Sequence, residues 1–256
     1  MPGSVRIAAV GDLHCTRAST GAFQALFARI AESADVLAMC GDLTDRGQAE
    51  EARVLAKELQ AVTMPKIAVL GNHDFESDAA AEVTEILAGA GVSILDGTAL
   101  EVAGIGIAGA KGFAGGFGDL ALQGWGEEPI KTFVRFAVEE TLKLESALAR
   151  LRTVGRVVLL HYAPVRDTCD GEPFEIYPFL GSSRLEEPLN RYAASAVFHG
   201  HAHRGRPEGK TAGGVPVYNV AMPLLQRLFP DRPPFRVVEI PAQPATPVAA
   251  GRGDAQ

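Results

Sequence analysis

The stretch KIAVLGNHDF, residues 66–75, is an apolar run that ends at a glycine and continues with an amide, an imidazole and a carboxylate. Three other runs end in a similar way: IAAVGD (7–12), VLAMCGD (36–42) and AVFHGHAH (196–203). Apolar runs without polar alternation are typical of strands that are buried on both faces of a parallel sheet. Ligands of such sheets bind at the carboxyl ends of the strands, so the four runs predict one shared polar site there.

The first ninety residues alternate strand-like and helix-like patterns. Asp12, Asp42 and Asn72 follow one another at intervals of 30 residues, which suits a strand, a crossover helix and the next strand. This spacing predicts an α/β fold. The predicted strands are 5–10, 35–40 and 66–70, and the predicted helices are about 20–33, 48–62 and 77–89.

The rest of the chain is less regular. Two strands are predicted within 98–112, a long helix at about 131–152 and a second helix near 184–194. Further strands are predicted at 155–161, 195–203, 215–221 and 235–240, the last at a sheet edge. We therefore expect one domain over residues 1–240 and a disordered Pro/Ala-rich tail over residues 241–256. Two loops, 111–129 and 165–183, are rich in glycine or in aromatic residues.

Bulk composition excludes several classes of protein. The chain has 24 basic and 31 acidic residues, a net charge of −7, and no dense basic cluster, which argues against binding to a nucleic-acid backbone. No run reaches the roughly 18 apolar residues of a membrane helix, so we expect no membrane partner. The N-terminus passes into a strand without a signal-like segment, and the three cysteines form no CxxC pair. These features predict a cytoplasmic protein, whose oligomeric state the sequence leaves open.

The histidines are concentrated at the ends of the apolar runs. Alternate residues of an extended chain point to the same side, so Asp12 and His14 form one pair of donors and His201 and His203 another. Mixed nitrogen and oxygen donors suit Mn, Fe, Ni, Co or Zn. Cys15 and Cys40 lie near these positions, but we expect them to be packing residues. The six histidines are His14, His73, His161, His199, His201 and His203.

Five motifs in this order resemble those of the calcineurin-like metallophosphoesterases, in particular the bacterial phosphodiesterase branch. They are GDLH (11–14), GDLTDRG (41–47), GNHD (71–74), LLHYAP (159–164) and GHAH (200–203). The resemblance implies a four-layer αββα sandwich of two mixed sheets flanked by helices, with the metal site at the C-terminal strand ends. It also implies two divalent or mixed-valence transition metal ions. The first would be held by Asp12, His14 and His203, the second by Asn72, His161 and His201, and both by Asp42.

The same resemblance implies roles for other residues. His73 is not a ligand in the family and would assist the leaving group as a catalytic residue. Asp45 would orient this histidine, and Arg46 would bind substrate phosphate, although Arg46 also fits a solvated residue at the start of a helix. His199 is expected beside the ligands rather than among them. Asp74 is expected to orient neighbouring groups or to cap a turn.

The function implied is hydrolysis of a small phosphate ester, most often a phosphodiester, by a hydroxide that bridges the two metals. One alternative is a phosphomonoesterase acting on nucleotides or phosphoproteins. Another is a non-catalytic scaffold with the same fold, which the presence of all seven ligands disfavours. Aromatic residues of the two loops, Trp125 and Phe179 among them, are expected either to select the substrate or to pin the loops to the domain.

Overall fold

The first strand of the structure, β1 (Ser4–Val10), is apolar on both of its faces. Ile7 and Ala9 pack into a core between two sheets, whereas Ala8 and Val10 pack toward helices. The same alternation recurs in the neighbouring strands, because successive side chains of a strand point to opposite faces. Strands of this kind can only be buried between two further layers. The sequence pattern thus explains why each sheet is covered on both sides.

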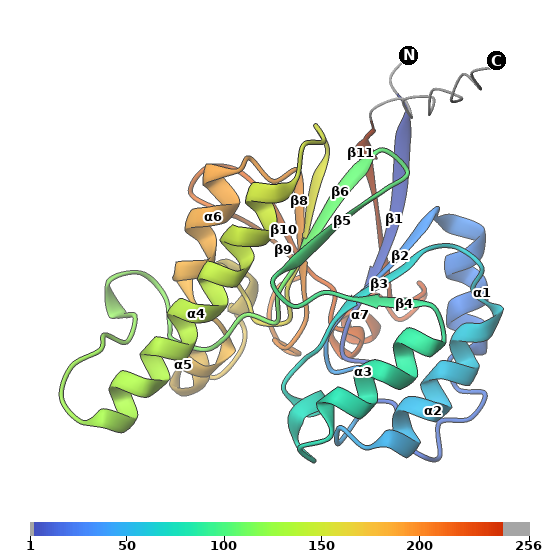
Figure 1. Ribbon diagram of the computed structural model, residues 1–256, viewed down its shortest axis with the longest axis horizontal. Coiled ribbons are helices and arrows are strands. Elements are labelled where there is room, and N and C mark those ends of the chain that lie inside the picture. The colour runs from blue at the N-terminus through green and yellow to red at the C-terminus, as the bar shows by residue number, and fades with distance from the viewer. Residues whose placement is uncertain (1–2, 243–256) are drawn as a thin grey trace, which may run out of the picture.

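The computed structural model describes residues 3–242. Figure 1 shows its two sheets facing each other, with helices on the outer face of each. The first sheet has the order β11-β1-β2-β3-β4, in which only β11 is antiparallel to its neighbour. Its other strands are β2 (Val36–Cys40), β3 (Lys66–Val69), β4 (Val92–Ile94) and β11 (Arg236–Pro241).

The second sheet has the order β5-β6-β7-β8-β10-β9. Its four central strands are parallel, and β5 and β9 pair antiparallel at the two edges. Its strands are β5 (Thr98–Val102), β6 (Ile105–Gly109), β7 (Arg156–Leu159), β8 (Ala196–His199), β9 (Glu208–Lys210) and β10 (Pro216–Asn219). Both sheets are therefore mixed, as the family resemblance implies.

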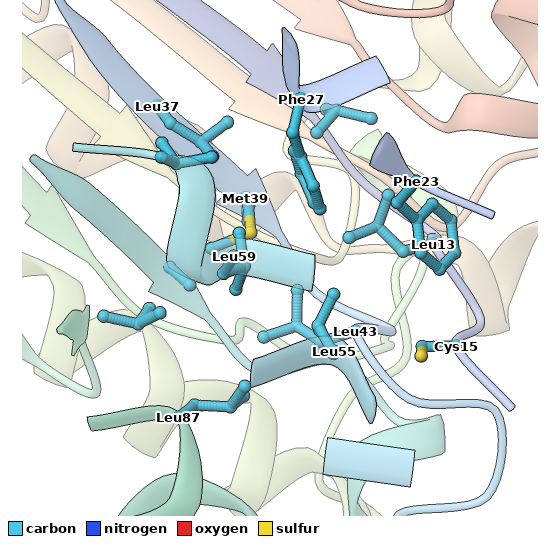
Figure 2. Packing of buried hydrophobic residues seen from close by; sticks show 14 of the residues in the cluster. Leu13, Cys15, Phe23, Phe27, Leu37, Met39, Leu43, Leu55, Leu59 and Leu87 are labelled. Atoms are coloured by element: carbon cyan, nitrogen blue, oxygen red, sulfur yellow. The ribbon is translucent and has the colours of Figure 1, made fainter. Parts of the chain in front are cut away.

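Helices α1 (Gln24–Ser33), α2 (Ala49–Glu58) and α3 (Ala80–Gly89) cover the first sheet, and α4 (Glu128–Arg150) and α6 (Glu186–Arg191) cover the second (Figure 1). Figure 2 shows part of the first helix layer, where Phe27, Leu55 and Leu59 pack in one cluster with Leu37 and Met39 of β2. The two remaining helices are short: α5 (Tyr177–Leu180) and α7 (Met222–Leu228). The predicted four-layer αββα sandwich is confirmed.

Several local features differ from the expectations. The short elements β4, β9, α5 and α7 were not predicted. The predicted tail begins at Pro241, but Pro241 ends β11, and the buried Ala242 donates a backbone hydrogen bond to Gly3 O. Residues 243–256 of the predicted tail lie outside the described residues. None of the helices between residues 3 and 242 is both long and apolar enough to cross a membrane.

Candidate metal centre

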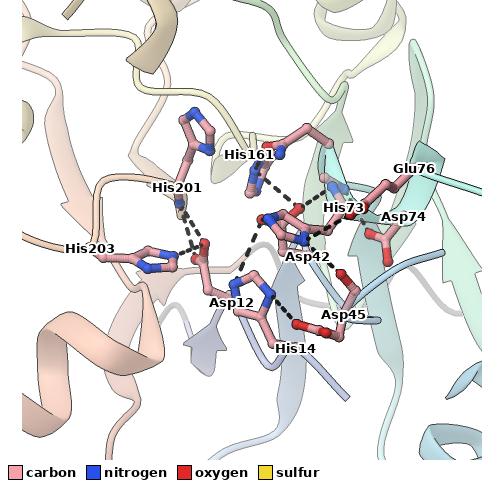
Figure 3. Close-up of polar contacts among 12 residues, drawn as sticks. Asp12, His14, Asp42, Asp45, His73, Asp74, Glu76, His161, His201 and His203 are labelled. Atoms are coloured by element: carbon pink, nitrogen blue, oxygen red, sulfur yellow. Dashed lines mark hydrogen bonds and ion pairs between the residues drawn. The ribbon is translucent and has the colours of Figure 1, made fainter. Parts of the chain in front are cut away.

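The carboxyl ends of strands from both sheets meet at one edge of the sandwich (Figure 3). In the first sheet, Asp12 follows β1, Asp42 follows β2 and Asn72 follows β3; in the second, His161 follows β7 and His201 follows β8. This arrangement brings together donors that are up to 191 residues apart in the chain, such as Asp12 and His203. The strand-end positions read from the sequence therefore converge in space.

Four of the expected ligands have a left-handed backbone. The φ angles are 56° at Asp12, 44° at His14, 47° at Asp42 and 70° at His201. Non-glycine residues seldom adopt this region, and such strain persists where the surrounding structure enforces it. Here the backbone N–H of Asp12 donates to Gly41 O, and that of His14 donates to Asp42 O, each at 2.9 Å. At the ends of β1, β2 and β8 the turn therefore lies in ligand residues, whereas Asn72, after β3, has a φ of −68°.

The glycines before the ligands serve mainly to leave space. Only Gly41 of the four has a positive φ, at 79°. A Cβ at Gly71 would overlap Oδ1 of Asp42 and lie 2.8 Å from Cε1 of His161, and a Cβ at Gly200 would overlap Oδ2 of Asp12. Three of these glycines thus have no left-handed backbone, and what the site requires of them is the absence of a Cβ.

One set of donors consists of Asp12, His14 and His203, whose ligand atoms all lie within 4.8 Å of one another. Nε2 of His203 lies 2.8 Å from Oδ1 of Asp12, which is fully buried. The backbone N–H of His201 also donates to this carboxylate, at 2.9 Å from Oδ1. Asp12 is thereby fixed at the centre of its set.

A second set consists of Asp42, His161 and His201 and has the same compactness. Nδ1 of His161 donates to Cys40 O at 3.0 Å, which leaves Nε2 as the free acceptor. Oδ1 of Asn72 lies 2.8 Å from this Nε2. Nε2 of His201 faces Phe179 O at 3.2 Å, and this contact orients the ring. Hydrogen bonds of this kind fix the tautomer and direction of metal-ligating imidazoles.

Asp42 belongs to the second set and also lies beside His14 of the first. Its Oδ1 is 3.4 Å from Nε2 of His161, and its Oδ2 is 3.8 Å from Nε2 of His14. The backbone N–H of His73 donates to Oδ1 at 2.9 Å and holds the carboxylate in place. This position suits a ligand shared by two ions.

The donors present fit metal ions. Among residues 3–242, the two buried ring nitrogens of His14 find no hydrogen-bond partner, which costs about 1–3 kcal/mol per buried polar group. Nε2 of His161 faces two oxygen acceptors, Oδ1 of Asn72 and Oδ1 of Asp42, without a proton between them. Cations placed here would satisfy the one lone pair of a neutral His14 ring and that of Nε2 of His161, and the donor set is of the type that binds divalent transition metals.

Burial also favours the neutral form of the imidazoles, which is the form that binds metal. Burial, together with the neighbouring His161, lowers the pKa of His201 to about 3, and burial lowers the pKa of His14 from its ordinary value. Both rings are therefore neutral near pH 7, the form in which histidine binds metal. The carboxylates that balance the site are Asp12 and Asp42.

His73 is held beside the two sets by a 3-10 turn, His73–Phe75. Its Nδ1 lies 2.6 Å from the main-chain oxygen of Asp45, so the carbonyl rather than the carboxylate of Asp45 orients the ring. Burial lowers the pKa of His73, but the bond to Asp45 O and the charge of Asp42 outweigh this effect and raise it. Nε2 is left facing Oδ2 of Asp42 at 4.0 Å.

The side chains of Asp45 and Arg46 lie at the rim. Oδ1 of Asp45 is 3.5 Å from Nδ1 of His14, and its Oδ2 is 3.8 Å from Nε of Arg46. The Arg46 side chain is 66% exposed. Arg46 is thus exposed at the rim, and among residues 3–242 its guanidinium forms an ion pair only with Asp45.

Asp74 is the fully buried connection between the second and third motifs. It accepts backbone hydrogen bonds from Leu43, Thr44 and Gly71 and a fourth from Oγ1 of Thr44. Burial raises the pKa of this carboxyl, although these bonds oppose the shift. The expectation that Asp74 orients neighbouring groups is confirmed by these contacts.

His199 and the cysteines stand apart from the donor sets. Nδ1 of His199 donates to Gly200 O and Nε2 lies 2.8 Å from Oγ1 of Thr168, so both ring nitrogens are used. Burial lowers the pKa of His199 to about 4. Cys15 and Cys40 are fully buried free thiols in the hydrophobic core, where burial raises their pKa values. The packing role expected of the cysteines is confirmed.

Sequence reasoning missed two contributors to the site. One is Phe179 O, since a backbone carbonyl leaves no signal in the choice of residue. The other is the ring of Tyr162, whose centroid is 4.6 Å from that of His201. Tyr162 directly follows the predicted ligand His161 in the loop after β7, and this neighbouring position was the one available signal.

Solved structures with similar folds come from distant proteins. Phosphopantetheinyl hydrolase of Mycobacterium tuberculosis aligns with a TM-score of 0.65 and 19% identity, over 93% of this chain and 97% of that one. A Staphylococcus aureus protein assigned as a 5′-nucleotidase aligns at 0.54 and 13%, over 86% and 49%. GAP50, the anchor in the inner membrane complex of Plasmodium, aligns at 0.51 and 14%, over 86% and 72%. At these identities the likeness concerns the fold alone.

Sequence comparison is decisive for the family. No curated protein matches the chain in sequence. The model of the calcineurin-like phosphoesterases matches residues 5–205, a range that contains all five motifs and both donor sets. The chain belongs to the calcineurin-like phosphoesterase family.

Proposed function

We propose that the protein is a hydrolase of phosphate esters that prefers phosphodiesters and works with two transition metal ions. The observation that carries this proposal is the position of Asp42 between two compact donor sets. Two ions that share a carboxylate can hold both the attacking and the leaving oxygen of an in-line displacement. The ring nitrogens of His14, which are buried without a hydrogen-bond partner among residues 3–242, support the presence of metal without reference to the family.

The residues would divide between the ions as the motifs imply. When bound, the ions would supply Lewis acidity and lower the pKa of water between them to near neutrality. Mn, Fe, Zn, Ni and Co all suit the donors. The first ion would be held by Asp12, His14 and His203, the second by Asn72, His161 and His201, and both by Asp42.

His73 is proposed to transfer the proton to the departing oxygen. Nδ1 is occupied by Asp45 O, so Nε2 is the atom that faces the site. The hydrogen bond to Asp45 holds the ring in one orientation, as general acid catalysis requires. Arg46 is proposed to contact a phosphoryl oxygen, because its exposed guanidinium lies at the rim beside Asp45.

The preference for diesters is supported by space next to the first donor set. A cavity of about 500 Å³ has Phe179, Ile176 and Leu180 on its apolar side, and its polar lining residues are His201, His203, Glu172 and Arg204. Its apolar wall could hold the ester group that stays on the phosphate. The Mycobacterium tuberculosis relative in fold is named for hydrolysis of a phosphopantetheinyl group, which is also a phosphate ester.

Two alternatives remain as outcomes of the test. Hydrolysis of monoesters is favoured by Arg46, which suits a terminal phosphate, and by the likeness to a protein assigned as a 5′-nucleotidase. A non-catalytic scaffold is suggested only by the likeness to GAP50, which is described as an anchor. The complete donor sets argue against the scaffold.

The test is a screen of metal-reconstituted protein against generic diesters, cyclic nucleotides, phospholipid head groups and monoesters. We expect close to two metal ions per chain and the highest kcat/KM on a diester. A higher kcat/KM on monoesters would overturn the diester preference. Less than one metal ion per chain and no hydrolysis would favour the scaffold.

The remaining expectations on partners and location fit this function. A net charge of −7 suits a small ester held by metal better than a nucleic-acid backbone. The three free, buried cysteines suit the cytoplasmic location expected from the sequence.

A further inference from the structure

Lys111 lies directly beside the metal centre, two residues after β6. Its backbone oxygen accepts hydrogen bonds from the N–H groups of His161 and Tyr162, at 3.0 and 3.2 Å. This contact ties its backbone to a proposed ligand. The five motifs do not include Lys111, and none of the roles assigned above uses its side chain.

The ammonium group of Lys111 is surrounded by aromatic rings. Nζ lies 5.0 Å from the ring centroid of Phe113, 5.1 Å from that of Tyr162 and 5.6 Å from that of Phe75. Its one hydrogen bond among residues 3–242 is to Gly112 O, at 3.0 Å. The ring faces attract a cation, but they offer no acceptor lone pairs for the other two N–H bonds.

The nearby carboxylates are already occupied. Glu140 accepts from the N–H of Gly112 and from Nζ of Lys143, and Asp96 also binds Nζ of Lys143. Within the described part of the chain, no carboxylate lies within 4.0 Å of Nζ of Lys111. A partly buried ammonium without an anionic partner is costly, and ionisable groups in such surroundings are concentrated at functional sites.

The position of Nζ relative to the site indicates which part of a substrate it would meet. Phe75 belongs to the same 3-10 turn as His73, so Lys111 lies on the side where the leaving group would depart if His73 acts as proposed. The ring of Tyr162 separates it from His201. Lys111 also lines a cavity of about 460 Å³ with Leu70 and Phe75 and with residues of α3 and β4.

We infer that Lys111 is a specificity-determining residue that binds an anionic group on the departing alcohol of the substrate. This inference rests on the proposed hydrolysis of phosphodiesters and adds the chemistry of the leaving side. The alcohol would carry a carboxylate or phosphate within reach of Nζ, and an apolar part would lie against Phe75 and the cavity. Glu85 and Asp96 also line this cavity, but both are exposed, and Asp96 is already bound to Nζ of Lys143.

The experiment uses two diesters that differ only in charge on the departing group. These are methyl 4-nitrophenyl phosphate and its analogue with a carboxylate on the nitrophenyl ring. The metal-loaded wild type should favour the carboxylate analogue in KM. Lys111→Met, which keeps an apolar chain of similar length, should raise KM for the analogue about tenfold or more and leave KM for the diester without the carboxylate within about twofold. Lys111→Arg should retain part of the preference.

Controls separate this role from general charge and from folding. Lys131→Met, at an exposed position of α4, should change neither KM. Arg46→Met should not abolish the preference for the carboxylate; if it does while Lys111→Met does not, Arg46 is the anion-binding group and the inference is overturned. A melting temperature of Lys111→Met at or above wild type is expected, because an ammonium without an anionic partner has been removed.

Failure of the inference is distinguishable from failure of the proposed function. If the metal-loaded wild type hydrolyses neither diester, the proposed function fails. If it hydrolyses both and Lys111→Met changes the two KM values equally, or neither of them, Lys111 does not recognise the departing group. A sharp drop in melting temperature with equal loss on both substrates would make Lys111 a structural residue.

Discussion

Nε2 of His161 and Oδ1 of Asn72 lie 2.8 Å apart, although β7 and β3, the strands that they follow, belong to different sheets. The candidate metal centre therefore connects the two halves of the sandwich at their shared edge. Metal binding and the stability of this edge must be linked, because an ion held by residues of both sheets binds only when the sheets are correctly placed.

The first prediction concerns this linkage and Asp42. Removing metal with a chelator should lower the stability of the wild type, by about 2.7 kcal/mol if the free metal had been at 100 times its Kd. Asp42→Ala should abolish hydrolysis and lower metal content, because both ions lose a shared anionic ligand. Metal analysis and thermal melting with and without Mn²⁺ measure both effects. Normal metal content and turnover in Asp42→Ala would refute the assignment, and Asp35→Ala, at an exposed ion pair, is the control.

The second prediction concerns His73. His73→Gln should leave metal content near that of wild type and lower kcat about 10²–10⁴-fold, the scale of general acid–base catalysis. The loss should shrink for esters with very good leaving groups, which depart without a proton. Steady-state kinetics on a series of substituted aryl esters gives the comparison. Equal losses along the whole series would count against the acid role.

The third prediction concerns Asp74, which accepts four hydrogen bonds in the interior. Asp74→Ala leaves buried donors of Leu43, Thr44 and Gly71 without partners and should cost about 3–5 kcal/mol of the free energy of unfolding. Chemical denaturation measures this loss. Glu76→Ala, two residues away and exposed, should change stability by less than about 0.5 kcal/mol. Similar values for the two variants would mean that Asp74 does not anchor the motifs.

The fourth prediction concerns the space left by Gly71. Its φ is not positive, so Gly71→Ala strains no left-handed backbone, but the new Cβ would overlap Oδ1 of Asp42. We expect metal affinity to fall at least about tenfold, as measured by metal titration. Gly89→Ala is the matched control, since a Cβ at Gly89 of α3 has no heavy atom within 4 Å. Unchanged metal affinity in Gly71→Ala would show that the carboxylate can move without loss.

The fifth prediction concerns the aromatic residues of the two loops. Phe179 lines the cavity beside His201 and His203, whereas Trp125 is 70% exposed. Phe179→Ala should raise KM for the preferred diester several-fold. The activity of the variant on a minimal ester, which contacts only the metals, should change little. Trp125→Ala, measured in the same way, tests whether the loop 111–129 contributes to substrate binding. If the melting temperature falls sharply and activity on both substrates is reduced equally, the aromatic residues hold their loops against the domain and do not select the substrate.

The extent to which the sequence predicts this molecule differs between its parts. The strands β1, β2 and β3 were predicted within one residue at each end, because continuous apolar runs bounded by glycine admit few other structures. The strand β9, with the sequence EGK, has no apolar pattern and exists only because β10 offers an edge to pair with. The helix α7 follows a strand end and is defined by packing of Leu224 and Leu225 rather than by a long periodic segment.

The metal centre also has some features that the sequence predicts and others that it does not. The donor residues could be read from strand ends, since parallel strands present their carboxyl ends at one edge. The left-handed backbone at Asp12 and Asp42 could not be predicted, because it depends on hydrogen bonds between neighbouring strand ends. Lys111 gave no signal either, since Phe75, Phe113 and Tyr162 come from three separate segments and only the fold brings them around its ammonium.

The pairing of β11 with β1 has a practical consequence for handling the protein. Ser4 is the cross-strand partner of Pro241, and β1 runs from this pair about 20 Å toward Asp12. An affinity tag or fluorescent reporter attached through either terminus would therefore join the domain at the end of the sheet away from the metal centre. The same closeness of Gly3 and Ala242 allows a short linker to join them in a circular permutant, with new termini opened between Gly124 and Trp125, where the chain is exposed.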